Sequence, residues 1–565
     1  MMTRSELLQR LQSMTRTEIL IVGGGINAVG LYRDLAAQGI PSLLVEKGDF
    51  CSGTSAAPSR LIHGGLRYLE TGEFALVRES VEERNLLLRN APHYVKPLPV
   101  WVPVTNRWSG LLTAGARFLR LIRNPGPRGA LVLKLGLTVY DWFGAKYRSM
   151  PRHRMINGRT ALREMPGLHP SICSVGEFYD ARLTNAERLT LELVADAEAD
   201  CPQAMAIPYL AAIGHDGEAV LLRDEIVGEI HRVTPRIVIN AAGAWIDQVD
   251  AALGIDEKLV GGTKGSHLVL DHPQLAAALG EHMIYFSTAD HRLCLAYRLE
   301  RNLVLIGTTD LPTDDPEDMT CSEAEVDYLF RVMAEVMPAL KLDRSQIIFR
   351  YAGVRPLPKA ADGTVAGAIS RDHHIQAFPA GAARPYEVLT LVGGKWTTYR
   401  ACAEQIADMV LQRLQQRRRA DTRGLEIGGG ANWPQDADAL RSYIADLAKS
   451  CNLTPDRAEI LFGRYGTYAR HVAGSLNGDA PLHSLPGYSR GEILHLVRFE
   501  RTTRLADLVL RRTQIGLAGL ASPVVIAELA EIMAAAHAWP PERKEAEIDH
   551  ASRLLQKRHG VLTLG

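Results

Sequence analysis

The sequence lacks several features that would assign it to whole classes of protein. It contains no run of roughly 18 apolar residues, so no segment predicts a membrane-spanning helix. Its seven cysteines are scattered without a CxxC pair, which argues against zinc and iron–sulfur sites, and we expect no metal centre. The odd cysteine count favours a reducing compartment. Neither sign of charge is in excess, with 64 basic and 64 acidic residues, and this balance argues against a nucleic-acid-binding protein.

The N-terminal segment lacks the apolar core that a secretory signal peptide needs. Residues 1–18 carry charges throughout, so we expect a cytoplasmic protein. A short helix ahead of the first strand is predicted by the helical spacing of Leu7, Leu11 and Met14. The length of 565 residues predicts two or three domains.

A glycine-rich turn follows the first predicted strand. The apolar, partly β-branched run 18–22 leads into Gly23 and Gly25, and a helical segment and a second apolar run precede Glu46. Gly23 permits a tight turn, Gly25 lets the backbone approach a pyrophosphate at the helix N-terminus, and Ala28 stands at the third glycine position. Glu46 is placed to accept hydrogen bonds from ribose hydroxyls. The unit predicts a dinucleotide-binding domain without separating NAD from FAD.

The segment after Glu46 carries a resemblance to a known family. Residues 54–70 read TSAAPSRLIHGGLRYLE, which resembles the flavin-proximal signature of the aerobic, FAD-dependent glycerol-3-phosphate dehydrogenases. The resemblance covers about residues 17–530. Further matching motifs are IVINAAGAW at 237–245, KGSH at 264–267, LIGTTD at 305–310, YAGVRPL at 351–357, SRD at 370–372, GGKWTTYR at 393–400 and ERTTRLADLVLRRTQIG at 500–516.

The resemblance implies FAD as the cofactor. Lys395 stands at the start of a helix whose N-terminus would favour negative charge on the N1–C2=O2 edge of the flavin. The positions expected to bind FAD are Gly23, Gly25, Ile26, Asn27, Glu46, Lys47, Thr54, Ser55, Ser59, Leu61, Ile62, Ala242, Gly243, Trp245, Gly394, Lys395, Thr397 and Thr398.

The reaction that the resemblance implies is oxidation of sn-glycerol 3-phosphate to dihydroxyacetone phosphate. Hydride would pass from C2 to flavin N5 and the electrons to membrane quinone. A phosphate dianion needs cations, preferably arginines, although surface ion pairing is the alternative for each one. The expected substrate-binding residues are Arg67, Tyr68, Lys264, Arg355, Arg371 and Lys395.

Two histidines lie inside the matching motifs. His63 and His267 are both candidates for the base that removes the hydroxyl proton, since imidazole titrates near neutral pH. Either could instead be a core imidazole that orients a glycine loop. The sequence leaves this choice open.

The sequence also leaves the substrate open. Tyr179 directly abuts Asp180, where the family has a spacer, and Ala57 and Pro58 stand where hydroxyl residues are common. A dehydrogenase of another polyol phosphate, such as erythritol phosphate, and an O2-using glycerol-phosphate oxidase are therefore alternatives. A redox-sensing dinucleotide-binding module is the non-enzyme alternative, but it would not need the set of cations.

A basic stretch separates the first motifs from the later ones. From Arg84 to Tyr140 there are nine Lys or Arg residues and no acidic residue. Within 111–139, apolar residues interleave with Arg117, Arg120 and Arg123 at roughly helical spacing. This pattern favours a pair of helices on an anionic membrane surface, and a buried hairpin with a basic rim is the alternative. We therefore expect a peripheral protein on the inner face of the cell membrane.

The expected fold class is α/β. An FAD-binding Rossmann-like domain of the glutathione-reductase and amino-acid-oxidase type would be joined by an inserted mixed-sheet substrate domain and a C-terminal helical domain. The helical domain would support the sheets or form an oligomer interface, for instance that of a homodimer. The expected boundaries are 17–95, 150–260 and 350–412 for the first domain, 96–150 and 260–350 for the second, 413–432 for a linker and 433–565 for the helices.

Overall fold

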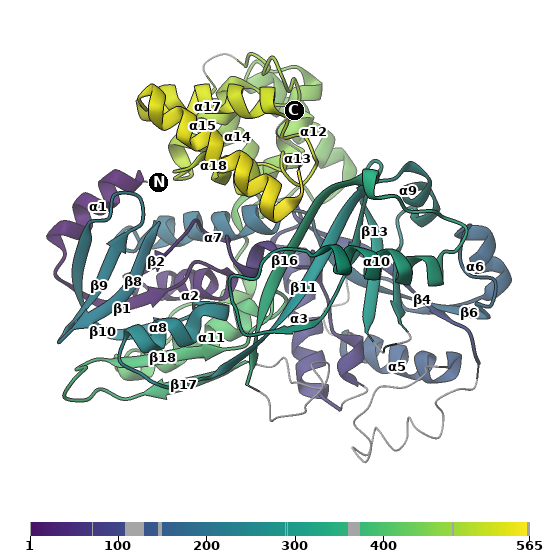
Figure 1. Ribbon diagram of the computed structural model, residues 1–565, viewed down its shortest axis with the longest axis horizontal. Coiled ribbons are helices and arrows are strands. Elements are labelled where there is room, and N and C mark those ends of the chain that lie inside the picture. Colours follow the sequence, from purple (N-terminus) through teal and green to yellow (C-terminus); the bar gives the residue numbers. More distant parts are fainter. Residues whose placement is uncertain are drawn as a thin grey trace.

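The structure is a computed structural model with two mixed β-sheets and a C-terminal group of helices that lies across one end of both (Figure 1). It describes residues 2–69, 72–107, 129–144, 150–288, 290, 292–359, 373–476 and 479–561, without the side chain of Arg67. The predicted fold class is confirmed.

The first sheet has a parallel centre. β1, β2, β7, β10 and β18 run parallel to one another, which suits strands that are buried on both faces. β17 adds an antiparallel edge, and the hairpin of β8 and β9 extends β10. The strand bounds are Arg16–Val22 for β1, Ser42–Glu46 for β2, Met205–Pro208 for β7, Leu210–Asp216 for β8, Ala219–Asp224 for β9, Ile230–Asn240 for β10, His374–Phe378 for β17 and Glu387–Val392 for β18.

Three helices pack together over this sheet. α2 (Ile26–Ala37) lies between α7 (Ala186–Asp200) and α11 (Tyr399–Arg413), and their apolar faces share a core with β1 and β18. The short α8 (Ile246–Ala252) contacts β8 and β18. The N-terminal helix α1 (Arg4–Ser13) begins at a capping box formed by Thr3 and Glu6, which confirms the helix predicted ahead of the first strand.

The second sheet is mainly antiparallel. Its described strands follow the order β15-β11-β14-β13-β12-β4-β6-β3, with β16 on β11 and β5 on β6. The strand bounds are Leu61–Ile62 for β3, Val95–Val104 for β4, Arg154–Asn157 for β5, Ser174–Leu183 for β6, Val260–Asp271 for β11, Met283–Ser287 for β12, Leu293–Glu300 for β13, Leu303–Gly307 for β14, Leu311–Thr313 for β15 and Ile347–Pro358 for β16.

Helices cover both faces of the second sheet. α3 and α5 share one core with it, whereas α6, α9 and α10 share another. Among the described residues, no helix is both long and apolar enough to cross a membrane. The helix bounds are Phe74–Asn90 for α3, Ala130–Phe143 for α5, Gly158–Glu164 for α6, Pro273–Leu279 for α9 and Glu323–Val336 for α10.

The second sheet takes more of the chain than the predicted boundaries gave it. β5 and β6 fall in the range 150–260 predicted for the first domain, yet β6 pairs with β4 along its whole length. β3 also joins this sheet although it lies within 17–95. Alternating strand patterns do not specify which sheet a strand enters, because the partner is chosen by tertiary packing.

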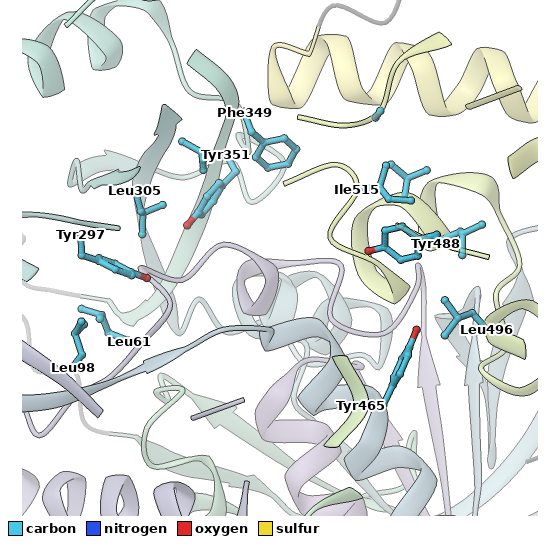
Figure 2. Close-up of a cluster of buried hydrophobic side chains, with 14 of the residues drawn as sticks. Leu61, Leu98, Tyr297, Leu305, Phe349, Tyr351, Tyr465, Tyr488, Leu496 and Ile515 are labelled. Carbon is cyan, nitrogen blue, oxygen red and sulfur yellow. The ribbon is translucent and has the colours of Figure 1, made fainter. Parts of the chain in front are cut away.

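The C-terminal helices share a hydrophobic core with the second sheet. Phe349 and Tyr351 of β16 belong to the same cluster of buried side chains as Tyr488 and Ile515 of the helical domain (Figure 2). A turn of π-helix at Leu508–Arg512 follows α16. The helix bounds are Ala437–Ser450 for α12, Pro455–Tyr465 for α13, Ala469–Gly474 for α14, Arg490–Phe499 for α15, Leu505–Asp507 for α16, Pro523–His537 for α17 and Pro541–His559 for α18.

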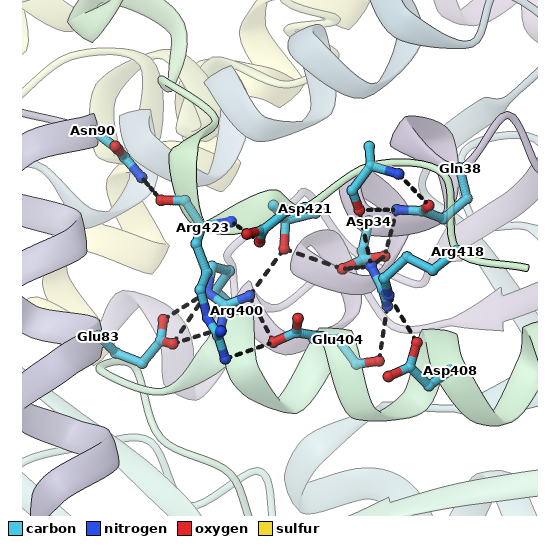
Figure 3. Close-up of polar contacts among 12 residues, drawn as sticks. Asp34, Gln38, Glu83, Asn90, Arg400, Glu404, Asp408, Arg418, Asp421 and Arg423 are labelled. Carbon is cyan, nitrogen blue, oxygen red and sulfur yellow. Dashed lines mark hydrogen bonds and ion pairs between the residues drawn. The ribbon is translucent and has the colours of Figure 1, made fainter.

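The segment 413–432, predicted as a linker, is packed against the first domain. Arg418 bonds Asp34 at 2.8 Å and Asp408 at 2.8 Å, and the carbonyl of Arg423 accepts a hydrogen bond from Asn90 at 2.9 Å (Figure 3). Polar residues and glycines in a sequence do not show whether such ion pairs form. The segment is therefore an ordered strap between the sheet domains and the helical domain.

Candidate FAD and substrate site

The predicted glycine turn closes against the first sheet at the carboxyl end of β1. Gly23 has φ +115°, and a Cβ atom there would lie 2.7 Å from the carbonyl oxygen of Ala241. A side chain at this position would therefore clash as well as strain the backbone. Gly25 is the N-cap of α2, so the helix begins with backbone N–H groups directed out of the turn.

Glu46 joins the ends of β1 and β2. Its carboxylate accepts a hydrogen bond from the backbone N–H of Gly24 at 2.6 Å and from that of Gly48 at 2.8 Å. Burial raises the pKa of Glu46 despite these two hydrogen bonds. The carboxylate is thus fixed beside the glycine turn, and it keeps lone pairs for the hydrogen bonds that we expect from ribose hydroxyls.

A cavity of about 670 Å³ lies along this turn. Residues that line it come from both sheets and from the helical domain. Of the residues predicted to bind FAD, the lining includes Gly23, Gly25, Ile26, Asn27, Glu46, Lys47, Thr54, Ser55, Ala242, Gly243, Trp245 and Gly394.

These residues fit an adenine dinucleotide. The Oδ1 atom of Asn27 is buried and has no hydrogen-bond partner among the described residues, as a polar atom directed at a bound cofactor would. Ser55 accepts the N–H of Ile26 at 3.0 Å, and Trp396 donates its indole N–H to the carbonyl of Ser55 at 3.0 Å. The backbone on both sides of the cavity is therefore held before a ligand enters.

Lys47 and Trp245 form a separate corner of the cavity. The Nζ atom of Lys47 lies 4.2 Å from the Trp245 ring centroid, and both side chains donate to Oε1 of Glu317, at 2.9 and 2.8 Å. Nothing in the sequence around Glu317 indicates this role, and only its contacts show that it is part of the cavity wall.

Arg355 is anchored over Gly265. Its Nη1 donates to Oδ1 of Asp310 at 2.9 Å and its Nη2 to Oγ1 of Thr308 at 3.1 Å. A Cβ atom on Gly265 would lie 2.0 Å from Nη2, so only glycine leaves room for the guanidinium. The LIGTTD, KGSH and YAGVRPL motifs thus meet at one place.

His267 shares the face of the sheet with Arg355. Its Nε2 lies 2.8 Å from Oγ of Ser59, and its ring stacks on Tyr351 with centroids 4.9 Å apart. Burial, Arg355 and Arg60 together lower the pKa of His267 to about 3. The imidazole is therefore neutral throughout the physiological pH range.

Lys264 lies on the opposite face of β11. Side chains alternate along a strand, so positions 264 and 267 point to opposite faces. Lys264 pairs with Asp318 at 3.0 Å and with Glu325 at 3.2 Å. Lys264 was predicted to join a cation cluster, but the structure separates it from Arg355 and His267. Its ammonium group is instead paired with two carboxylates, one half-buried and one buried.

His63 lies in a loop that is braced from two directions. Its backbone N–H donates to Oγ1 of Thr397 at 3.1 Å. The next amide, of Gly64, donates to Tyr140 at 2.9 Å and to Asp180 at 3.1 Å. The Tyr140 hydroxyl bonds Asp180 at 2.5 Å, so a buried pair fixes this turn.

Tyr68 and Lys395 are brought together. The Nζ atom of Lys395 lies 4.0 Å from the centroid of the Tyr68 ring. Thr397 and Thr398 are buried at the start of α11, whereas Leu61 and Ile62 form β3 beside β6. The side chain of Arg67 and all of Arg371 lie outside the described residues, as do Arg117, Arg120 and Arg123.

Comparisons with known proteins match this architecture over nearly the whole chain. Residues 18–409 match the model of the FAD-dependent oxidoreductase family, and residues 420–544 match the C-terminal domain of alpha-glycerophosphate oxidase. A glycerol-3-phosphate dehydrogenase of Synechocystis sp. is 33% identical over 529 residues, which is 89% of each chain. The chain belongs to the FAD-dependent glycerol-3-phosphate dehydrogenase family.

Membership in this family confirms FAD as the cofactor and an oxidoreductase as the class of enzyme. A D-erythritol 1-phosphate dehydrogenase of Brucella abortus is 28% identical over 504 residues, covering 88% of this chain and 94% of that one. The structure of a glycerol-3-phosphate dehydrogenase from Bacillus halodurans complexed with FAD has the same fold, with a TM-score of 0.74 and 21% identity over 98% of this chain and 97% of that one.

Proposed function

We propose that the protein oxidises sn-glycerol 3-phosphate to dihydroxyacetone phosphate and passes the electrons to membrane quinone. The observation that carries this proposal is the convergence of Arg355, His267 and Ser59 on one sheet face next to the FAD cavity. Relatives at 33% and 29% identity are named glycerol-3-phosphate dehydrogenases, which supports the same substrate.

Arg355 is proposed to bind the phosphate. Asp310 and Thr308 fix the plane of its guanidinium, which presents five N–H donors in a rigid fork. The side chain is 20% exposed, so an incoming phosphate would be partly desolvated where it meets the charge. Lys395, beside Tyr68, is proposed as a second cation for the phosphate or the flavin. Arg67 and Arg371 remain proposals from the family motifs.

His63 is proposed as the base for the O2 proton. A base with a pKa near 3 would be a poor proton acceptor at neutral pH, which disfavours His267 for this role. His267 instead orients the Ser59 hydroxyl and presents a neutral ring to the substrate side of β11. The two hydrogen bonds to Gly64 keep His63 in a fixed loop.

FAD, when bound, supplies the two-electron acceptor for the hydride that leaves C2. The chain's part is to hold the cofactor with the turn at Gly23, Glu46 and Ser55, and to take the O2 proton. The N-terminus of α11, with Thr398 at the N-cap position, directs the positive end of a helix dipole toward the site.

Helix α5 is proposed to rest on an anionic membrane surface. Leu131, Leu135 and Trp142 are 46%, 69% and 73% exposed, and they share one face of the helix with Lys134. Side chains on the other face, including Leu133 and Leu137, pack against the second sheet. An exposed apolar face of this kind, at the C-terminal end of the basic stretch from Arg84 to Tyr140, supports peripheral attachment.

The test is anaerobic mixing of the purified protein with a panel of substrates while the flavin absorbance is followed. We expect rapid bleaching by sn-glycerol 3-phosphate, slower bleaching by D-erythritol 1-phosphate and little by glycerol. Faster bleaching by the erythritol compound would overturn the assignment, and the relative from Brucella abortus makes it the first alternative. Rapid reoxidation by air without quinone would instead identify an oxidase.

A further inference from the structure

The turn that carries the ribose-binding Glu46 is held by the C-terminal domain. Three residues after Glu46, Asp49 is 1% exposed and is one of the residues that line the cavity. Arg511 and Arg512, from the π-helical turn after α16, both donate to its carboxylate. The second Nη atom of Arg512 bonds Oδ1 of Asp49 at 2.9 Å. A buried ion cluster therefore joins positions more than 460 residues apart in the chain.

The cluster is closed on the side of the helical domain. Arg511 also bonds Asp507 at 2.6 Å, and the Tyr209 hydroxyl donates to the same carboxylate at 2.5 Å. Burial tends to raise the pKa of Asp49, but Arg512 and Arg511 outweigh it and hold that pKa below its usual value. Both cations pair with Asp49, and Arg511 pairs with Asp507 as well. Removing the Asp49 carboxylate would therefore leave the buried charge of Arg512 without this partner.

Asp49 is connected to the cofactor turn through backbone hydrogen bonds. The adjacent Gly48 donates its N–H to Glu46 and accepts from the N–H of Tyr209 at 2.7 Å. Two residues later, the backbone N–H of Cys51 donates to the carbonyl of Gly24 at 2.9 Å. Cys51 has φ +57°, a left-handed conformation that a non-glycine residue adopts only when its surroundings impose it. Fixing Asp49 therefore fixes both the carboxylate and the glycine turn that FAD needs.

The helical domain also forms part of the wall of the same cavity. Its lining includes Arg504, Leu510 and Arg511 beside the ion cluster, and His550, Leu554 and Arg558 on α18. At the end of α18, His559 stacks on Phe349 of β16 with ring centroids 4.3 Å apart. Two independent contacts thus place the domain against the cofactor site, one through charge and one through packed rings.

We propose that the C-terminal helical domain is a structural part of the FAD-binding site. Arg511 and Arg512 are positioning residues, which act on the cofactor through Asp49 and the turn from Glu46 to Cys51. Docking of the helical domain and binding of FAD are then coupled, and each must strengthen the other by the same factor. This inference rests on the cofactor and is independent of which polyol phosphate is oxidised.

The first test measures FAD affinity in Asp49→Asn, by the fluorescence of FAD released on dilution. Coupling between sites is typically about 5- to 150-fold, and we expect the dissociation constant to rise at least about tenfold. The matched control is Asp34→Asn, because Asp34 is 2% exposed, bonds Arg418 of the strap 413–432 at 2.8 Å and does not line the cavity. It should change FAD affinity by less than about threefold, since distant sites act independently.

The second test needs no variant. Hydrogen exchange is compared between holoenzyme and FAD-depleted protein, and removal of FAD should speed exchange in 505–512 more than in α12 or α13. Where Asp49→Asn fails to fold, Arg511→Gln leaves the Arg512 contact in place and should still raise the FAD dissociation constant. An unchanged FAD affinity in the variant that folds, or equal acceleration across all C-terminal helices, would overturn the proposal.

Discussion

Arg355→Ala is the sharpest test of the proposed substrate site. The guanidinium is held by Asp310 at 2.9 Å and Thr308 at 3.1 Å and lies over Gly265, so its position is set before substrate arrives. Losing a charge-assisted hydrogen bond between this fixed guanidinium and the substrate phosphate costs about 2–4 kcal/mol. This figure includes the cost of leaving the phosphate without its partner. At 1.4 kcal/mol per factor of ten, kcat/KM for glycerol 3-phosphate should fall about 30-fold or more.

The assay compares glycerol 3-phosphate with unphosphorylated glycerol, using an artificial dye as acceptor. Glycerol has no phosphate to lose, so its much lower kcat/KM should change far less in the variant. Arg355→Lys keeps the positive charge but not the forked guanidinium, so its kcat/KM for glycerol 3-phosphate should lie between those of Arg355→Ala and the native protein. FAD content and the melting temperature are the controls, and the surface variant Arg344→Ala, in an exposed ion pair, should be neutral. Equal losses for the two substrates would refute a phosphate-binding role.

Three further predictions concern Tyr140, His267 and the exposed face of α5. Tyr140→Phe, which removes the hydroxyl that braces Gly64, should lower kcat about tenfold with KM and FAD content nearly unchanged, as expected for a lost buried hydrogen bond of about 1–2 kcal/mol; an unchanged kcat would contradict this. Because the folded pKa of His267 is about 3 and the unfolded one about 6.5, its neutral form contributes stability above pH 6.5 that declines as pH falls toward 3. Between pH 6.5 and 5, the free energy of unfolding measured with urea should therefore fall by about 2 kcal/mol less in His267→Gln than in the native protein. Replacing Leu135 and Trp142 with Ser should move the enzyme from membrane to supernatant with dye activity intact; the same change at the exposed Val524 should not, and loss of dye activity would mean that α5 serves the core alone.

Local physics explains which parts of the site could be predicted. Gly23 sits in a turn that only glycine can make, and Glu46 ends the next strand, so both are specified by neighbours in the sequence. The position of Lys264 could also have been anticipated. It is three residues from His267 in the same strand, and alternation alone puts them on opposite faces.

Other parts depend on contacts between distant segments. Nothing near Asp49 indicates that its charge is met by Arg511 and Arg512, because the motif at 500–516 has the composition of an ordinary surface helix. Asp180 likewise gains its role only when β6 places it beside Tyr140 of α5. Tertiary packing decides which charged residues form buried ion pairs. In a single sequence, such a residue is visible only as a charge among apolar neighbours with no evident role.

Strand β16 shows why the helical domain matters for chemistry carried out on the sheet. Phe349, Tyr351 and Arg355 have the same parity, so they share one face of this strand. Phe349 stacks on His559 of α18, Tyr351 stacks on His267, and Arg355 reaches over Gly265. Because packed rings are close to incompressible, a shift of α18 would displace Tyr351, and His267 would move with it. The cofactor turn is reached from the same domain through Asp49, so the helices act on both ends of the reaction site while contributing none of the groups proposed to contact substrate.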